Sequence, residues 1–180
     1  MFKRIVLAVV LVAILATGTV FANDPRPEGF GIGVVAGAFN SWDGGSADFG
    51  RDAWRGGLAL HTADIYWGIR AGGGSNWIHI DASGDFMTLF GGNIEGPLGW
   101  YIDVGLYGGV GIYSPPSPAS GGIRLDFGAR LPIGLNLNFG ILDIWLAIVP
   151  TVGLGINTID NTDFGIGGGW GPEFGIRLWL

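Results

Sequence analysis

The sequence contains no cysteine, so disulfide frameworks and thiolate metal sites are excluded. Charged residues make up only 13 % of the chain, against a usual ~25 %, and Lys3 is the only lysine. Aromatic residues nevertheless make up 13 %, and disordered segments have few aromatics and many charges. Glycine is abundant instead, at 36 of 180 positions. Each glycine inside a helix costs about 1 kcal/mol relative to alanine, so a helical bundle is excluded and glycine-rich strands are favoured.

The first residues have the organisation of a secretory signal peptide. Lys3 and Arg4 precede an uninterrupted apolar run over Ile5–Leu15, and small residues follow as far as Ala22. A membrane-spanning helix needs ~20 apolar residues, so this run is too short for a retained anchor. We therefore expect 1–22 to be a cleaved signal peptide and 23–180 to be the mature domain. Without Lys3 and Arg4, seven basic residues face 15 acidic ones, and this net charge of −8 provides no footprint for nucleic acid.

Hydrophobicity alternates with a period of two residues along eight segments, which is the pattern of β-strands with two different faces. In the second half of the chain each segment has one apolar face without any charge, and all its charges lie on the other face. These segments are 100–113, 123–139, 144–156 and 164–180. The segments of the first half, 30–37, 54–61, 65–70 and 78–83, alternate less regularly. Alternation is lost between Asp85 and Phe90, where we expect a β-bulge or a strand end.

Polar segments separate these eight strands and fall into two sets that alternate along the chain, as an up-and-down antiparallel barrel requires. One set is 40–52, 73–76, 114–120 and 157–163, and the other is 62–64, 91–98 and 140–143. An even number of strands predicts that both ends of the chain lie on the same side of the barrel.

The apolar faces are too bulky to point into such a barrel. Eight strands enclose an interior that side chains just fill, and the face that carries Leu125, Phe127 and Leu131 continues over 17 residues. The opposite faces are mostly glycine with isolated charged residues, and these fit inside. The apolar faces must then contact lipid, so the sequence predicts an all-β, eight-stranded antiparallel up-and-down transmembrane β-barrel. A soluble β-sandwich with one exposed glycine-rich face is the alternative.

Two short motifs carry a resemblance to a known family. Residues 128–135 read Gly-Ala-Arg-Leu-Pro-Ile-Gly-Leu, and 144–150 read Ile-Trp-Leu-Ala-Ile-Val-Pro. Together with Arg177, they resemble a small uncharacterised family of outer-membrane barrels from proteobacteria and spirochaetes, similar in architecture to OmpX, OmpW and the OmpA barrel. The resemblance covers about residues 98–180 and implies fold and location rather than activity. It also implies an acidic partner for Arg130 at the position where this chain has Ala147.

The predicted inner faces hold equal numbers of positive and negative side chains. We interpret these as an ion-pair network that plugs the lumen, because buried charges persist where they are paired. A charge-selective pore is the alternative. The network comprises Arg55, Arg70, Asp81, Asp85, Asp103, Arg124, Asp126, Arg130, Glu173 and Arg177. For Arg130 we expect Asp103, Asp126 or Glu173 as the partner, in that order, because Asp103 lies on the preceding strand.

The sequence offers little that could carry catalysis. His79 and Ser83 are four residues apart on one strand, roughly 13 Å, so they cannot share a hydrogen bond as a nucleophile and its base must. His61 is two strands away from His79. The pattern Gly31-Ile32-Gly33 lies inside an alternating strand rather than before a helix, so it is not a dinucleotide-binding loop. We therefore expect no catalytic residues, no cofactor and no metal site.

The first hypothesis is a non-enzymatic barrel in the outer membrane of a diderm bacterium, with a structural or surface-interaction role. The second is a narrow, porin-like transport barrel for small or hydrophobic solutes, and the third is a lipid-modifying enzyme. The expected partners are outer-membrane lipid, lipopolysaccharide and the outer-membrane assembly machinery. We expect the protein to be monomeric.

Overall fold

The computed structural model describes residues 24–38, 40–41, 54–62, 64–114, 121–158 and 163–180. The expected signal peptide and most of three expected connections, 40–52, 114–120 and 157–163, lie outside these residues. In the described part of the chain, no helix has the length and hydrophobicity that a membrane crossing requires.

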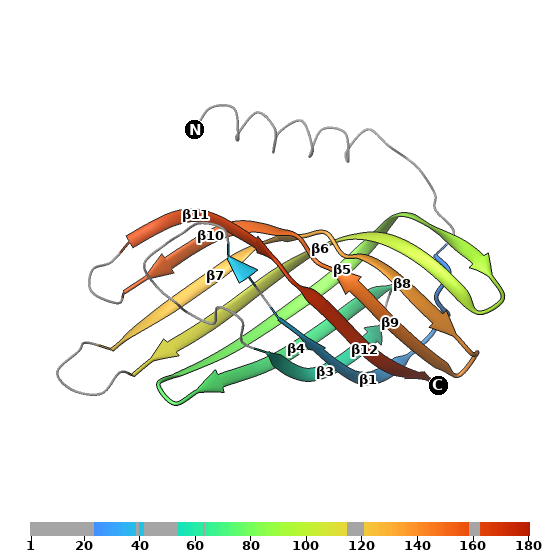
Figure 1. Cartoon of the computed structure of the whole chain (residues 1–180), viewed down its shortest axis with the longest axis horizontal. Helices are drawn as coiled ribbons and strands as arrows, with labels where there is room; N and C mark the ends of the chain where they lie inside the picture. The colour runs from blue at the N-terminus through green and yellow to red at the C-terminus, as the bar shows by residue number, and fades with distance from the viewer. Residues whose placement is uncertain (1–23, 39, 42–53, 63, 115–120, 159–162) are drawn as a thin grey trace, which may run out of the picture.

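Twelve strands form one sheet that closes on itself. They are β1 (Gly31–Gly37), β2 (Asn40–Ser41), β3 (Arg55–Thr62), β4 (Ile65–Gly74), β5 (Trp77–Glu95), β6 (Leu98–Tyr113), β7 (Gly122–Arg130), β8 (Ile133–Asn138), β9 (Leu142–Ile148), β10 (Thr151–Asn157), β11 (Asp163–Trp170) and β12 (Pro172–Trp179). Every pairing is antiparallel, and β1 pairs with both β3 and β12, which closes the barrel. Figure 1 shows the strands running obliquely around a long cylinder.

The twelve strands are segments of eight. Four pairs are consecutive segments of one long strand: β1 and β2, β7 and β8 on either side of 131–132, β9 and β10 on either side of 149–150, and β11 and β12 on either side of Gly171. A proline has no N–H to donate to the sheet, but its carbonyl still accepts. The amides of Asp103, Leu131 and Ala38 donate to the carbonyls of Pro132, Pro150 and Pro172 respectively. Pairing therefore continues through each interruption, and the predicted eight-stranded antiparallel barrel is confirmed.

Two local features of β5 refine the sequence prediction. The register between β5 and β6 shifts at Asp85/Met87, Thr88/Phe90 and Asn93/Glu95, so the region of lost alternation is bulged. Residues 91–95, expected to be part of a connection, instead continue β5 to Glu95. The turn is then only Gly96 and Pro97, and Gly96 has a positive φ of 55° that glycine adopts without strain. Because this turn needs only two residues, the polar residues before it belong to the strand, and the prediction that placed them in a connection ended the strand too early.

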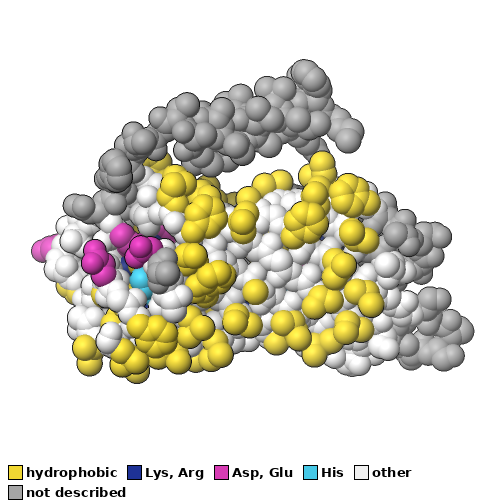
Figure 2. Space-filling view, turned by 180° about the vertical axis from the view of Figure 1, so that it is seen from behind, with side chains coloured by type: hydrophobic (Ala, Val, Ile, Leu, Met, Phe, Trp, Pro, Cys, Tyr) yellow, Lys and Arg dark blue, Asp and Glu magenta, His cyan; other side chains and the backbone are white. Residues whose placement is uncertain are grey.

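The distribution of side chains is the inverse of that in a water-soluble protein. Leu106, Phe127, Ile148 and Ile166 are between 52 % and 64 % exposed on the outer wall, whereas Asp103 and Asp143 are at most 1 % exposed. Hydrophobic side chains cover the wall in Figure 2, and acidic side chains gather at one end. An apolar exterior around a polar interior is the arrangement of a transmembrane barrel. The predicted orientation of the two faces is therefore confirmed, and the sandwich alternative is wrong.

Both described ends of the chain lie at the same end of the barrel. Gly31 at the start of β1 is paired with Trp179 at the end of β12, and Figure 1 shows the C-terminus beside the start of β1. The hairpin turns at 62–65, 95–98 and 138–142 lie at this end too, because each joins two paired antiparallel strands at the ends nearest to the chain termini. We call it the terminal end.

Ile148→Arg should impair assembly, because Ile148 is 54 % exposed on the outer wall and lies near the mid-height proline interruptions. An arginine at mid-depth in lipid destabilises a barrel by about 2–4 kcal/mol. The folded fraction can be measured by heat-modifiable migration in detergent gels. Ser75→Arg, in the exposed turn after β4, is the control and should assemble normally. Equal folding of the two variants would contradict the orientation.

Candidate functional site

The interior of the barrel contains the candidate site, and its centre is the carboxylate of Glu173. Two guanidinium groups from opposite sides of the wall share this carboxylate: Arg70 on β4 contacts Oε2, and Nη2 of Arg130 on β7 donates to Oε1 at 3.0 Å. Both arginines also donate to Oγ of Ser83 on β5, at 3.0 Å from Arg70 and 2.7 Å from Arg130. Nε of Arg130 lies 2.9 Å from Oδ1 of Asp85, an ion-pair contact at an angle too poor for a hydrogen bond. We call these five residues the central layer.

The sheet register explains why these side chains meet. Arg70 pairs with Asp81 across β4 and β5, and its Nε donates to Oδ1 of Asp81 at 2.7 Å. Arg130 pairs with Gly105 on β6. A Cβ at position 105 would overlap Oδ1 of Asp85. Glycine at that position thus leaves the room in which Asp85 reaches Arg130. The inner face is assembled from long charged side chains that lie opposite glycines.

A second group of charged residues lies on the side of the central layer away from the terminal end. Nη1 of Arg55 donates to Asp81 at 3.1 Å, so Asp81 binds two arginines. Nε2 of His79 lies 3.2 Å from Oδ2 of Asp126, which also accepts from Nε of Arg124. These interactions connect β3, β5 and β7.

A third group lies towards the terminal end. The guanidinium of Arg177 on β12 is 3.5 Å from Oδ2 of Asp143 on β9 and 4.5 Å from the ring centroid of Trp145. Asp103 on β6 pairs with Arg26, at 2.8 Å and 3.0 Å from the two carboxylate oxygens. Arg26 precedes the first strand, so this ion pair joins the chain before β1 to the wall of the barrel.

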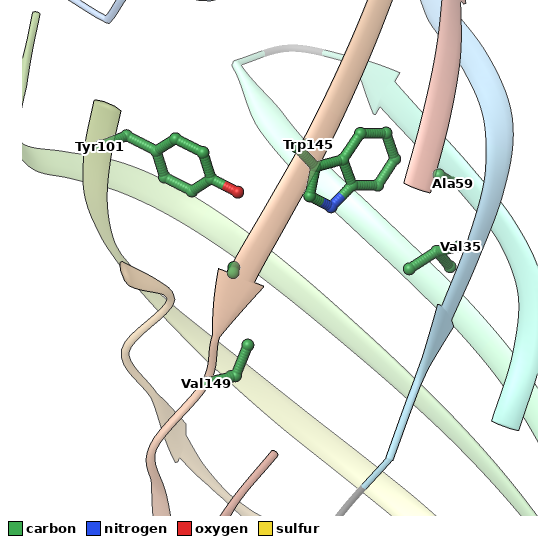
Figure 3. Close-up of a cluster of buried hydrophobic side chains, with 6 residues drawn as sticks. Val35, Ala59, Tyr101, Trp145 and Val149 are labelled. Atoms are coloured by element: carbon green, nitrogen blue, oxygen red, sulfur yellow. The ribbon is translucent and has the colours of Figure 1, made fainter. Parts of the chain in front are cut away.

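An apolar cluster of buried side chains lies inside the barrel beside the central layer. Tyr101, Trp145 and Val35 point towards one another from β6, β9 and β1 (Figure 3), together with Val149 after β9. Tyr101 is only 3 % exposed. Gly134 and Gly175 lie across from these rings, and a Cβ on either glycine would overlap Tyr101 or Trp145. Aromatic rings therefore lie in the lumen beside the ion pairs.

All ten residues predicted for the lumen network lie on the inner face, in the three groups just described. The expected order of partners for Arg130 is wrong, because Asp103 is occupied by Arg26 and Asp126 by Arg124 and His79. Glu173, the third choice, is the partner, with Asp85. Glu173 pairs in register with Ala147, so a carboxylate from the next strand lies opposite the position where the resemblance implied an acid.

Sequence reasoning missed two charged residues of the interior, Arg26 and Asp143, and the exposed Asp24, which binds Arg26. Asp24 and Arg26 lie before the first alternating segment, so no periodicity indicated their position. Asp143 was assigned to a turn, although it has the same parity along the chain as Trp145 and Ala147. Burial raises the pKa of Asp24, but the hydrogen bonds and charge of Arg26 outweigh this and hold the pKa below its usual value. Asp24 is therefore charged at neutral pH.

Ser83 and His79 do not form a nucleophile and base pair. Oγ of Ser83 accepts from Arg70 and Arg130, and His79 contacts Asp126 instead. His61 contacts the carbonyl of Gly29 at 2.5 Å. Within the described residues, no group of three or more histidine, cysteine or acidic side chains has the arrangement of a metal site.

Among known proteins, similarity to this chain is found with solved structures and not with family models or curated sequences. No family model matches the chain, and no curated protein matches its sequence. The crystal structure of Neisserial surface protein A (NspA) is 14 % identical, with a TM-score of 0.47, over 85 % of this chain and 98 % of that one. Ail, the attachment invasion locus protein of Yersinia pestis, is also 14 % identical, with a TM-score of 0.40, over 83 % of this chain and 96 % of that one. The resemblance to small outer-membrane barrels holds at the level of architecture, which rests on this chain's own strand pairing.

Glu173→Gln should destabilise the barrel by about 3–5 kcal/mol, because Arg70 and Arg130 would both lose a charged partner in a buried site. Urea unfolding of the detergent-folded protein measures this difference. Glu95→Gln makes the same chemical change at an exposed site at the end of β5 and should alter the free energy of unfolding by less than ~0.5 kcal/mol. An equal effect of the two substitutions would show that the central layer is not the stabilising element.

Proposed function

We propose that the protein is a small non-enzymatic outer-membrane barrel whose lumen is closed by its own side chains, with a structural or surface-interaction role. The observation that carries this proposal is the central layer. Its ion pairs join β4, β5, β7 and β12, which lie on different sides of the bore, through Arg70, Arg130 and the single carboxylate of Glu173. Opening a path for ions would require separating these buried, paired charges from one another.

One cavity among the described residues supports the same proposal. A cavity of about 20 Å³ lies between the central layer and the terminal end, with Ser83, Glu173 and Arg177 among its lining residues. A volume of this size holds about one water molecule. It is a gap between packed side chains, and a solute larger than water does not fit in it.

The proposed location is the outer membrane of a diderm bacterium, after export by the signal peptide 1–22. Closed barrels with an apolar outer band belong to that membrane, and the exposed wall has this character. The terminal end then faces the periplasm. The proposed partners are outer-membrane lipid and lipopolysaccharide on the wall, and the assembly machinery during insertion, with a monomeric barrel as the final state.

One observation favours the alternative, a narrow transport barrel. Several inner positions of β10 and β11 are glycine, and a Cβ on Gly165 would meet no atom within 4 Å. The open space at Gly165 lies at the end away from the termini, and in this alternative a small solute would enter there and reach as far as His79 and Asp126. A lipid-modifying enzyme has less support, because Ser83 is held by two arginines rather than by a base.

Planar-bilayer recording distinguishes the closed barrel from the transport barrel. The wild-type protein should produce no discrete channel openings, because the central layer closes the bore. The double variant Arg70→Ala/Glu173→Ala removes one charge of each sign and should produce discrete openings. Arg124→Ala/Asp126→Ala, a pair of opposite charges outside the central layer, is the matched control and should remain silent. Openings of the wild-type protein would favour transport, and altered lipid A in mass spectra of cells that express it would favour the enzyme.

Cell fractionation tests the location. The protein should remain with the membrane after osmotic shock and require detergent for release, because its outer wall is apolar. Release by osmotic shock alone would contradict the proposed location.

A further inference from the structure

The segment Asp24–Gly29 does not join the sheet, and the side chain of Arg26 enters the barrel from it. The first strand begins at Gly31, yet Arg26 is only 8 % exposed and its guanidinium lies inside the wall. Within the segment, Arg26 also donates from Nε and from its backbone amide to Oδ1 of Asp24. A side chain from outside the strands thus occupies the lumen, as a side chain of a bound peptide would.

The barrel wall provides a complete site for this guanidinium. The ring centroids of Tyr66 and Tyr101 lie 3.7 Å and 4.2 Å from Cζ of Arg26, which is cation–π geometry on two faces. The carboxylate of Asp103 accepts from both terminal nitrogens, and Oγ1 of Thr88 accepts at 3.0 Å. Aromatic faces with a bidentate carboxylate are the groups that recognise an alkylguanidinium. We call Tyr66, Thr88, Tyr101 and Asp103 the guanidinium site.

The segment is attached to the rest of the barrel at its other end. The amide of Leu180 donates to the carbonyl of Phe30, and His61 contacts the carbonyl of Gly29. Gly29 has a φ of 112°, a conformation that residues with a Cβ rarely adopt. Pro25 and Pro27 have no N–H, so fewer backbone donors lose water when the segment enters the lumen. Outside this attachment, the side chain of Arg26 makes most of the polar contacts that hold the segment in place.

Arg26 also covers the internal cavity. It lines the cavity of about 20 Å³ together with Ala59, Tyr66 and Tyr101. Ala59 is 1 % exposed and faces the interior from β3. If the segment left the lumen, the cavity and Ala59 would be accessible from the terminal end, while the central layer would remain intact beyond them.

We propose that the barrel contains an internal guanidinium-binding site whose resident ligand is its own Arg26, and that Asp24–Gly29 is a releasable latch over the terminal end of the lumen. The site would accept another alkylguanidinium, such as an arginine side chain of a peptide, when the latch is out. This proposal concerns the terminal end alone and holds whether or not the central layer conducts ions.

A single introduced cysteine tests the latch, because the chain has no cysteine of its own. Ala59→Cys places a thiol on the cavity, and a water-soluble maleimide should label it slowly when the latch is closed. Adding Arg26→Ala should raise the labelling rate by about tenfold or more, because the rate follows the population of the open state. Glu28→Ala, an exposed position of the same segment, is the matched control and should leave the rate unchanged.

Chemical rescue separates the site from a general loss of stability. Millimolar ethylguanidinium should slow the labelling of the Ala59→Cys/Arg26→Ala protein and leave that of the Glu28→Ala control unchanged. Gly99→Val provides a second route to opening, because a Cβ on Gly99 would lie 2.6 Å from Cβ of Pro25, and it keeps Arg26 itself.

Two results would overturn the proposal. One is fast labelling of Ala59→Cys with Arg26 present. The other is fast labelling of a heat-modifiable Arg26→Ala barrel that ethylguanidinium does not slow. If Arg26→Ala fails to fold, the Gly99→Val variant provides the test. If Ala59→Cys is then labelled no faster with Gly99→Val than without it, the latch is contradicted.

Discussion

In hydrocarbon, every backbone N–H and C=O must find a partner within the protein, and the rest of this structure depends on that constraint. Seven residue pairs between β1 and β12 remove the last free edge. The same constraint explains how prolines are tolerated in the long strands. Each lies where its carbonyl still accepts a hydrogen bond from the neighbouring strand, so the missing N–H leaves pairing intact on both sides.

Closure with only eight strands determines the chemistry of the interior. The bore is narrow, so side chains from opposite walls touch, and any charge within it must find a partner across the bore or on a neighbouring strand. Glu173 satisfies two arginines at once, and Asp81 does the same for Arg55 and Arg70. Glycines at positions such as Gly105 and Gly175 give the long side chains the space they need.

Period-two alternation was sufficient to predict the number of strands, their antiparallel order and the face that contacts lipid. It was sufficient because lipid outside and a narrow bore inside impose opposite requirements on successive residues. It did not predict the partners of Arg130, because these depend on the stagger between strands, which no alternation encodes. Nor could it place Arg26, since alternation assigns inner and outer positions only to residues of a strand, and Arg26 precedes the first strand. The sequence analysis predicted too long a turn after β5, because it assigned the whole polar stretch 91–98 to the connection. Gly96 and Pro97 are sufficient to form that turn.

The location of the arginines has a consequence for proteolysis. Every arginine that the structure describes has its side chain on the inner face or, for Arg26, inside the bore, and all but Arg26 belong to paired strands. The bond after Arg26 precedes Pro27. A protease that cleaves after basic residues can reach none of these bonds until the wall opens, and Lys3 is the only lysine. Survival of the bonds after these described arginines would therefore report closure of the barrel directly, without any added label.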